Sequence, residues 1–231
     1  MIEMKKIIVI CSVVMFVCIS VVIAETIFRD GLIHNIDYQI YEDVQVDPLT
    51  PNRHTTINLV GGGTIPYKLE GYCDSHLNIF GGSLLYLFAF DNTHAMIAGG
   101  SMSALVGDDT SYIYLIDGYT SQLFGYDNTT INISGGNIGD NLFVQDNAHI
   151  IINGFNFAVD GIPIDSNEIF SILGSSYSNE PFRRLTGILN NNDVLNVNLK
   201  IGNTASVNFI PEPSIAVLLF SGLFLLLRRR K

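Results

Sequence analysis

Short stretches in which apolar and polar side chains alternate recur at a nearly constant interval between positions 51 and 161. In each stretch two apolar residues are separated by a single residue that is usually polar. The pairs are Ile57 and Leu59, Leu77 and Ile79, Ala95 and Ile97, Ile113 and Leu115, Ile131 and Ile133, and Ile150 and Ile152. Alternation of this kind predicts β-strands with one buried face. We therefore expect an all-β chain.

Two further markers recur in step with these strands. Aspartates precede four of them, at Asp91, Asp109, Asp127 and Asp146, and the differences between their numbers are 18, 18 and 19. Glycines follow the strands, beginning at positions 61, 81, 99, 135 and 154, with Asp117 at the equivalent point of the remaining repeat. Asp-Asn and Gly-Gly steps form tight bends that β-branched residues avoid. The markers predict six coils.

A coil of about 18 residues cannot bury its apolar face alone, but it can do so when it stacks on copies of itself. We predict that residues 51–161 form a right-handed parallel β-solenoid, a β-helix, of about six coils. The open ends of such a fold attract other strands. We expect residues 25–50 to cap the first coil and residues 162–209 to supply capping strands at the last.

Positions 1–24 have the organisation of a signal peptide. Lys5 and Lys6 precede an apolar run over residues 7–23, and Ala24 places a small side chain where the peptidase cuts. We expect signal peptidase to cleave between Ala24 and Glu25. An uncleaved transmembrane helix is the alternative, because about 20 apolar residues span a bilayer. Both possibilities export the chain that follows.

The other end combines a Pro-Glu-Pro motif, an apolar segment and a basic terminus within residues 210–231. Pro211, Glu212 and Pro213 precede an expected transmembrane helix over residues 215–227, and the chain ends in Arg228, Arg229, Arg230 and Lys231. That helix rises about 20 Å, less than the roughly 30 Å of a bilayer core, so it is a marginal permanent anchor. The terminal cations act as a stop-transfer signal on the cytoplasmic side.

This tail resembles the PEP-CTERM sorting signal. The resemblance implies an exosortase as partner, a membrane-embedded cysteine protease-transpeptidase of Gram-negative bacteria, which removes the helix and passes the protein to the cell surface, commonly in species that make exopolysaccharide. It also implies a protein anchored in the inner membrane before processing and found at the cell surface or in the extracellular matrix afterwards. A plain tail anchor is the alternative. The resemblance covers the tail, with a weaker likeness at residues 160–163 and 184–189.

The segment between the two expected cleavage points is acidic. It holds six Lys and Arg and, once Glu3 and Glu212 are set aside from the chain's 22 acidic residues, 20 Asp and Glu, a formal charge of −14. Such a surface repels nucleic acid, so we expect no nucleic-acid partner. Cys73 is its single cysteine, so no intramolecular disulfide can form.

Two groups of side chains on the repeats could carry chemistry. Asp108, Asp109, Asp127 and Asp146 could meet on adjacent coils as paired carboxylates or as calcium ligands, although repeated aspartate at a bend also serves to form the turn. His76, His94 and His149 hold equivalent positions and could bind zinc or form a stacked ladder. We predict turns and ladders, with no cofactor, no metal and no catalytic residue.

The absence of Lys and Arg between Leu69 and Phe182 argues against a polyuronate lyase, which needs cations to hold its acidic substrate. We therefore predict an exported, non-enzymatic surface or extracellular-matrix protein that interacts with signal peptidase, an exosortase and the membrane. An exopolysaccharide-binding or exopolysaccharide-cleaving module is the alternative.

Overall fold

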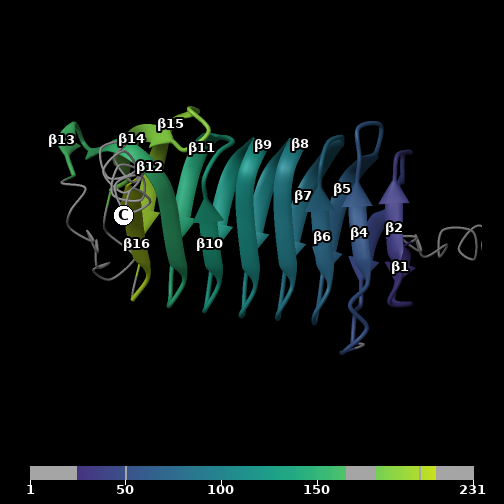
Figure 1. Cartoon of the computed structure of the whole chain (residues 1–231). Helices are drawn as coiled ribbons and strands as arrows, with labels where there is room; N and C mark the ends of the chain where they lie inside the picture. The colour runs from purple at the N-terminus through teal and green to yellow at the C-terminus, as the bar shows by residue number, and fades with distance from the viewer. Residues whose placement is uncertain (1–24, 50, 165–180, 203, 212–231) are drawn as a thin grey trace, which may run out of the picture.

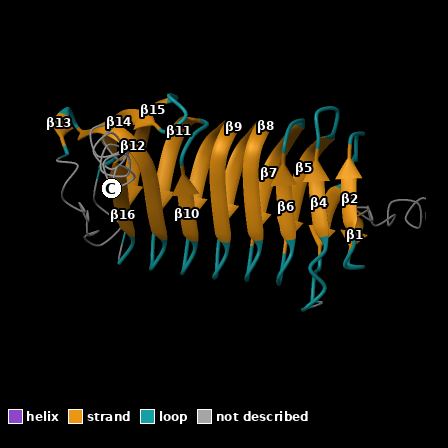
Figure 2. Cartoon of the chain, viewed as in Figure 1, coloured by secondary structure: helices purple, strands orange, loops and turns teal. Residues whose placement is uncertain are grey.

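Strands wind around one axis along the whole described chain. The computed structural model describes residues 25–49, 51–164, 181–202 and 204–211, and its 16 strands form an all-β solenoid of about seven turns (Figure 1). Within these residues there are strands and loops but no helix (Figure 2). The described part of the chain therefore contains no helix that could span a membrane. The helices expected at residues 1–24 and 215–227 lie outside the described part.

One wall of the solenoid, here called face A, consists of the strands that the alternation predicts. It contains β4 (Thr56–Leu59), β6 (His76–Ile79), β10 (Thr130–Ile133) and the first halves of β8 (His94–Gly107), β9 (Tyr112–Gly125) and β12 (His149–Val159). These strands pair in parallel, so that Ile97, Leu115 and Ile133 stack in one column. Every predicted inward residue from Leu77 to Ile152 is fully buried, which confirms the alternation.

A column of leucines forms the opposite wall. It runs through β5 (Thr64–Gly71), β7 (Ser83–Ala89), the second halves of β8 and β9, and β11 (Asn137–Val144), and Val44 of β3 (Asp43–Val46) continues it. Leu69, Leu87, Leu105, Leu123 and Leu142 occupy successive positions in parallel register and are fully buried. The core is therefore a stack of aliphatic layers enclosed between two walls of the solenoid.

The bends after β6, after β10 and after the face A halves of β8 and β9 require glycine. Gly82, Gly100, Gly118 and Gly136 all have positive φ angles, between 76° and 95°. A Cβ atom on Gly118 would lie 2.7 Å from the carbonyl oxygen of Gly99 on the coil before it. Backbone passes too close to backbone there for any side chain, and only glycine adopts this φ at little cost.

Coils of unequal length stay in register because extra residues are placed at the bends. Thr56 of β4 pairs with His76 of β6, whereas His94 of β8 pairs with Tyr112 of β9, a shorter step along the chain. Where β11 pairs with β9, the register shifts between Ile138 and Asn141. The irregularity lies outside the inward columns, so the core layers are preserved.

The first described residues join the same ladders. β1 (Glu25–Phe28) pairs in parallel with β3, and β2 (Ile33–Ile36) pairs in parallel with β4. These strands extend the stack beyond the six coils expected, to about seven turns. At the end of the inward columns stand two polar residues, Thr26 and His34, and the His34 ring lies 2.9 Å from Asp30.

Four strands complete the other end: β13 (Ile162–Pro163), β14 (Arg183–Leu189), β15 (Val194–Ile201) and β16 (Ser206–Pro211). β16 adds in parallel to β12 and β15 adds in parallel to β11, while β14 lies antiparallel between β12 and β15. Phe157, Leu185 and Val197 are buried among them. The last coil is thus covered by an apolar hairpin.

We expect Ile133→Asp to destabilise the protein far more than Asn132→Asp. Ile133 is fully buried, so an aspartate there would leave an unpaired carboxylate in the core, which costs several kcal/mol. Asn132 faces outward and accepts a hydrogen bond from Asn153, which an Asp oxygen also accepts. Chemical denaturation measures both free energies of unfolding. Equal losses for the two neighbours would contradict the assigned facing.

Candidate functional site

Four aspartates, here called the aspartate corner, occupy one edge of the solenoid: Asp91, Asp109, Asp127 and Asp146. Their φ angles are 51°, 55°, 48° and 58°, a left-handed conformation that Asp and Asn tolerate better than most residues. A backbone hydrogen bond closes each turn around its aspartate, as from the Thr129 amide to the Tyr126 carbonyl at 3.1 Å. The structure therefore confirms that these aspartates form turns.

The corner carboxylates also link neighbouring coils. Asp91 accepts a hydrogen bond from the Cys73 amide at 2.9 Å, and Asp109 accepts one from the Asp91 amide at 3.3 Å. In both cases the carboxylate bonds to the backbone one coil earlier. These carboxylate oxygens are therefore engaged in joining neighbouring coils.

Behind the aspartate corner runs a column of hydroxyl groups. Ser75, Thr93, Ser111 and Thr129 are fully buried. Ser75 and Thr93 share a hydrogen bond of 3.1 Å, and so do Ser111 and Thr129. Because these bonds satisfy buried polar atoms between coils, the inner side of the corner is structural.

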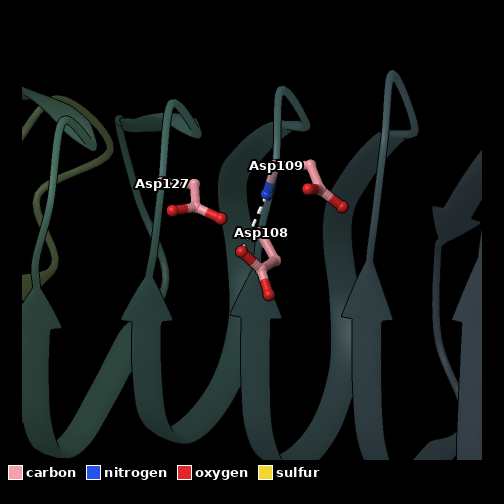
Figure 3. Close-up of side chains that lie close together, drawn as sticks. All are labelled: Asp108, Asp109 and Asp127. Carbon is pink, nitrogen blue, oxygen red and sulfur yellow. Dashed lines mark hydrogen bonds between the residues drawn. The ribbon is translucent and has the colours of Figure 1, made fainter.

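Three carboxylates gather at the middle of this edge. Asp108, Asp109 and Asp127 each place an oxygen within 4.8 Å of the others, and they form the one group of three possible metal ligands within the described residues. Figure 3 shows Asp108 between the two corner aspartates. Its Oδ1 accepts a hydrogen bond from the Asp109 amide at 2.8 Å. Three carboxylates could hold a divalent cation such as calcium, which prefers oxygen ligands.

Burial raises the pKa of Asp108, and the nearby Asp127 and Asp109 carboxylates raise it further. A carboxyl group that keeps its proton beside an ionised one is the pairing that glycosidases use. Here, however, Asp109 and Asp127 are exposed on turns, where water reaches both. The raised pKa is accounted for by burial and crowding of like charges, which need no substrate.

Two of the three candidate histidines form the predicted ladder. The rings of His76 and His94 stack with centroids 5.3 Å apart, and Tyr112 continues the stack at 4.9 Å. Burial lowers the pKa of His76, with a smaller contribution from the charge of His94. His149 lies in the same column but beyond Tyr112 and Thr130. The three imidazoles therefore do not converge on one point, as a zinc site requires.

His149 has partners that the sequence analysis missed. Its Nδ1 lies 2.6 Å from the Ser206 hydroxyl, and its Nε2 lies 3.3 Å from the amide nitrogen of Asn208. Both contacts join β12 to β16, so the imidazole serves to hold the last coil in place. The sequence did contain a signal for these contacts. Ser206 and Asn208 alternate with the apolar Val207 and Phe209, which predicts that they face outward on a further strand next to His149.

Two of the residues predicted for export and sorting belong to the first and last described strands. Glu25 is the first residue of β1, and Pro211 is the last residue of β16, paired with Gly154. Ala24, Glu212, Pro213 and the cations at 228–231 lie outside the described residues.

If the corner aspartates serve as turn residues, Asp109→Asn should leave the melting temperature nearly unchanged, because Asn adopts the same φ and offers the same acceptor. Asp109→Val should lower stability by about 1–2 kcal/mol, because a β-branched residue resists positive φ. Thermal unfolding followed by circular dichroism compares the two. A loss for Asn as large as that for Val would mean that the charge itself is required.

The raised pKa of Asp108 predicts a pH-dependent gain for Asp108→Asn. An acid whose folded pKa exceeds its unfolded value lowers stability as pH rises through that interval. The variant should therefore melt at a higher temperature than the wild type at pH 7, and the difference should shrink as the pH falls, because the protonated Asp108 carboxyl is neutral like the asparagine amide. Asp117→Asn is the control, since Asp117 bonds the following amide in the same way. A gain that persists at low pH would contradict the assignment.

Comparison with known proteins leaves the assignment to the residues themselves. No protein-family model matches the sequence, no curated protein matches it, and no solved structure matches the fold. The resemblance of the tail therefore stands as an expectation.

Proposed function

We propose that this chain is an exported, non-enzymatic protein of the cell surface or extracellular matrix, whose body is a short right-handed β-solenoid. Signal peptidase releases it by cleaving between Ala24 and Glu25. The C-terminal segment holds it in the inner membrane until an exosortase recognises Pro211, Glu212 and Pro213 and removes the tail.

The observation that carries this proposal is the use of polar side chains at the corner. Two of the corner aspartates, Asp91 and Asp109, accept hydrogen bonds from backbone amides of the preceding coil. Thr110 donates to Asn92 one coil earlier, at 2.7 Å. A surface whose polar groups stabilise its own coils suits a rigid spacer better than an enzyme.

The positions of the expected cleavage points support the same proposal. The fully buried core begins at Ile36 and continues to Val207, with Phe209 nearly buried in the same last strand. Processing after Ala24 and near Pro211 would therefore remove no buried apolar residue, and it would affect at most the last pair of the β12–β16 ladder, Pro211 with Gly154. A mature protein of this length keeps all the packing that stabilises it.

Cleavage of a polysaccharide is the weaker candidate. The Asp108 and Asp127 pair offers a raised pKa beside a second carboxylate, which favours acid catalysis. Yet both lie on an accessible edge in a segment that contains no Lys or Arg between Leu69 and Phe182. The pair has no cation within that segment that could hold an acidic sugar in place.

The proposal predicts that the native host removes the apolar segment and the basic terminus that follow the Pro-Glu-Pro motif, by resemblance to the family. Replacing Pro211-Glu212-Pro213 by three alanines tests this prediction, because the replacement keeps the apolar segment and the terminal cations. The variant should retain its C-terminus and accumulate in the inner membrane. Mass spectrometry of peptides from surface material and from membranes measures both outcomes.

A matched control replaces Glu180 and Pro181, a second Glu-Pro pair within the exported segment, by alanine; this variant should be processed normally. A peptide ending in Lys231 on mature surface protein, in a host that has an exosortase, would identify the tail as a plain anchor. Normal processing of the triple-alanine variant would show that the Pro-Glu-Pro motif is not read.

A further inference from the structure

The outward side chains of face A change in size across three neighbouring strands. On β9 they are Tyr112 and Tyr114, and on β12 they are His149 and Ile151. Between them, on β10, stand the smaller Thr130 and Asn132, each in register with its neighbours on both sides. These six residues are here called the β10 strip. It presents larger side chains along both edges and small polar ones along its centre.

Aromatic surface is exposed on one edge of this strip. The side chains of Tyr112 and Tyr114 are 39% and 41% exposed, although both belong to a central strand of the sheet. Tyr112 is held in place by stacking on His94, with ring planes inclined by 13°. One ring face packs against His94, so the other is directed along the axis towards Thr130. A fixed, half-exposed ring provides a flat apolar platform at little cost in entropy.

The centre of the strip offers hydrogen-bonding groups. Asn132 uses its oxygen to accept a bond from Asn153 at 2.7 Å, which leaves its amide nitrogen directed elsewhere. Within the described part of the chain, neither that nitrogen nor the Thr130 hydroxyl makes a hydrogen bond. Donors and acceptors of this kind suit hydroxyl groups, which both donate and accept.

The charge around the strip restricts the ligand. No Lys or Arg occurs between Leu69 and Phe182, and the segment as a whole is strongly acidic. A uronate or phosphate group would meet no cation of that segment and would be repelled. A neutral ligand rich in hydroxyl groups meets neither obstacle.

The size of the strip also favours a single narrow ligand. Two strand spacings are about 10 Å and three residues of strand are about 10 Å, so the strip covers roughly 100 Å². A stable protein interface needs about 800 Å² on each partner. The strip therefore fits the width of one extended sugar chain better than it fits a second protein.

We propose that the β10 strip binds a neutral, hydroxyl-rich polysaccharide chain, with Tyr112 and Tyr114 contacting the apolar faces of its sugar rings and Thr130 and Asn132 bonding its hydroxyls. This binding site goes beyond the proposed function, and it does not depend on processing of the tail. It involves no bond cleavage.

Affinity electrophoresis tests the proposal with the full chain in a polyoxyethylene detergent, which carries no sugar. Native gels contain hydroxyethylcellulose, galactomannan or dextran as neutral probes, or polygalacturonate as the acidic one. At least one neutral polymer should retard the wild type. Combined Tyr112→Ala and Tyr114→Ala changes should weaken that retardation about tenfold or more, because two aromatic contacts are lost.

Tyr86 and Tyr119 serve as matched controls, since they are 41% and 42% exposed and lie off the strip. Combined Tyr86→Ala and Tyr119→Ala changes should leave retardation intact, and the two double variants should lose melting temperature to a similar extent, because all four side chains are partly buried to the same degree. Failure of all three neutral polymers to retard the protein would overturn the proposal. So would equal loss in both variants, equal retardation by polygalacturonate, or a change in oligomeric state confined to the Tyr112 and Tyr114 variant.

Discussion

Parallel stacking in register is the constraint on which every other feature of this molecule depends. A shift of one residue between two coils would turn each inward side chain outward, because side chains on a strand alternate. Leu115 and Ile133 therefore have to remain neighbours, however many residues connect them. The chain meets this requirement by confining differences in length to the bends, as at the shift between Ile138 and Asn141. The inward columns consist of similar aliphatic side chains, and the differences in sequence between coils are found at the corners and at outward positions.

The sequence predicted the features that repetition produces. The inward facing of Ile131 and Ile133 follows from alternation alone, and the turn at Asp109 follows from spacing together with the tolerance of Asp for positive φ. The strands before residue 50 were less readable, because Arg53 stands three residues before β4, where later coils have the marker aspartate. The loop before β4 is closed instead by the buried Asp47 carboxylate, which accepts two hydrogen bonds from Thr55.

Contacts that depend on side-chain direction were beyond such patterns. The spacing allowed Asp108, Asp109, Asp127 and Asp146 to meet on adjacent coils, but which of them come together depends on how each side chain leaves its turn, and only the first three do. Likewise, Ser206 meets His149 from a distant part of the chain, and only the parallel addition of β16 to β12 brings them together. The β10 strip also depends on which strands are neighbours. Tyr112 and Tyr114 are exposed there because the side chains beside them, Thr130 and Asn132, are small.

The dependence of each coil on its immediate neighbours alone has an evolutionary consequence. Coils bounded by the same turn residues, such as those beginning at Asp91 and Asp109, present nearly interchangeable upper and lower surfaces to the stack. Duplication or loss of a whole coil in the gene would rejoin matching layers, while the polar residues at the first coil and the hairpin at the last would still close the ends. Length can thus drift between lineages more freely than composition, so related chains are expected to differ first in how many coils they carry.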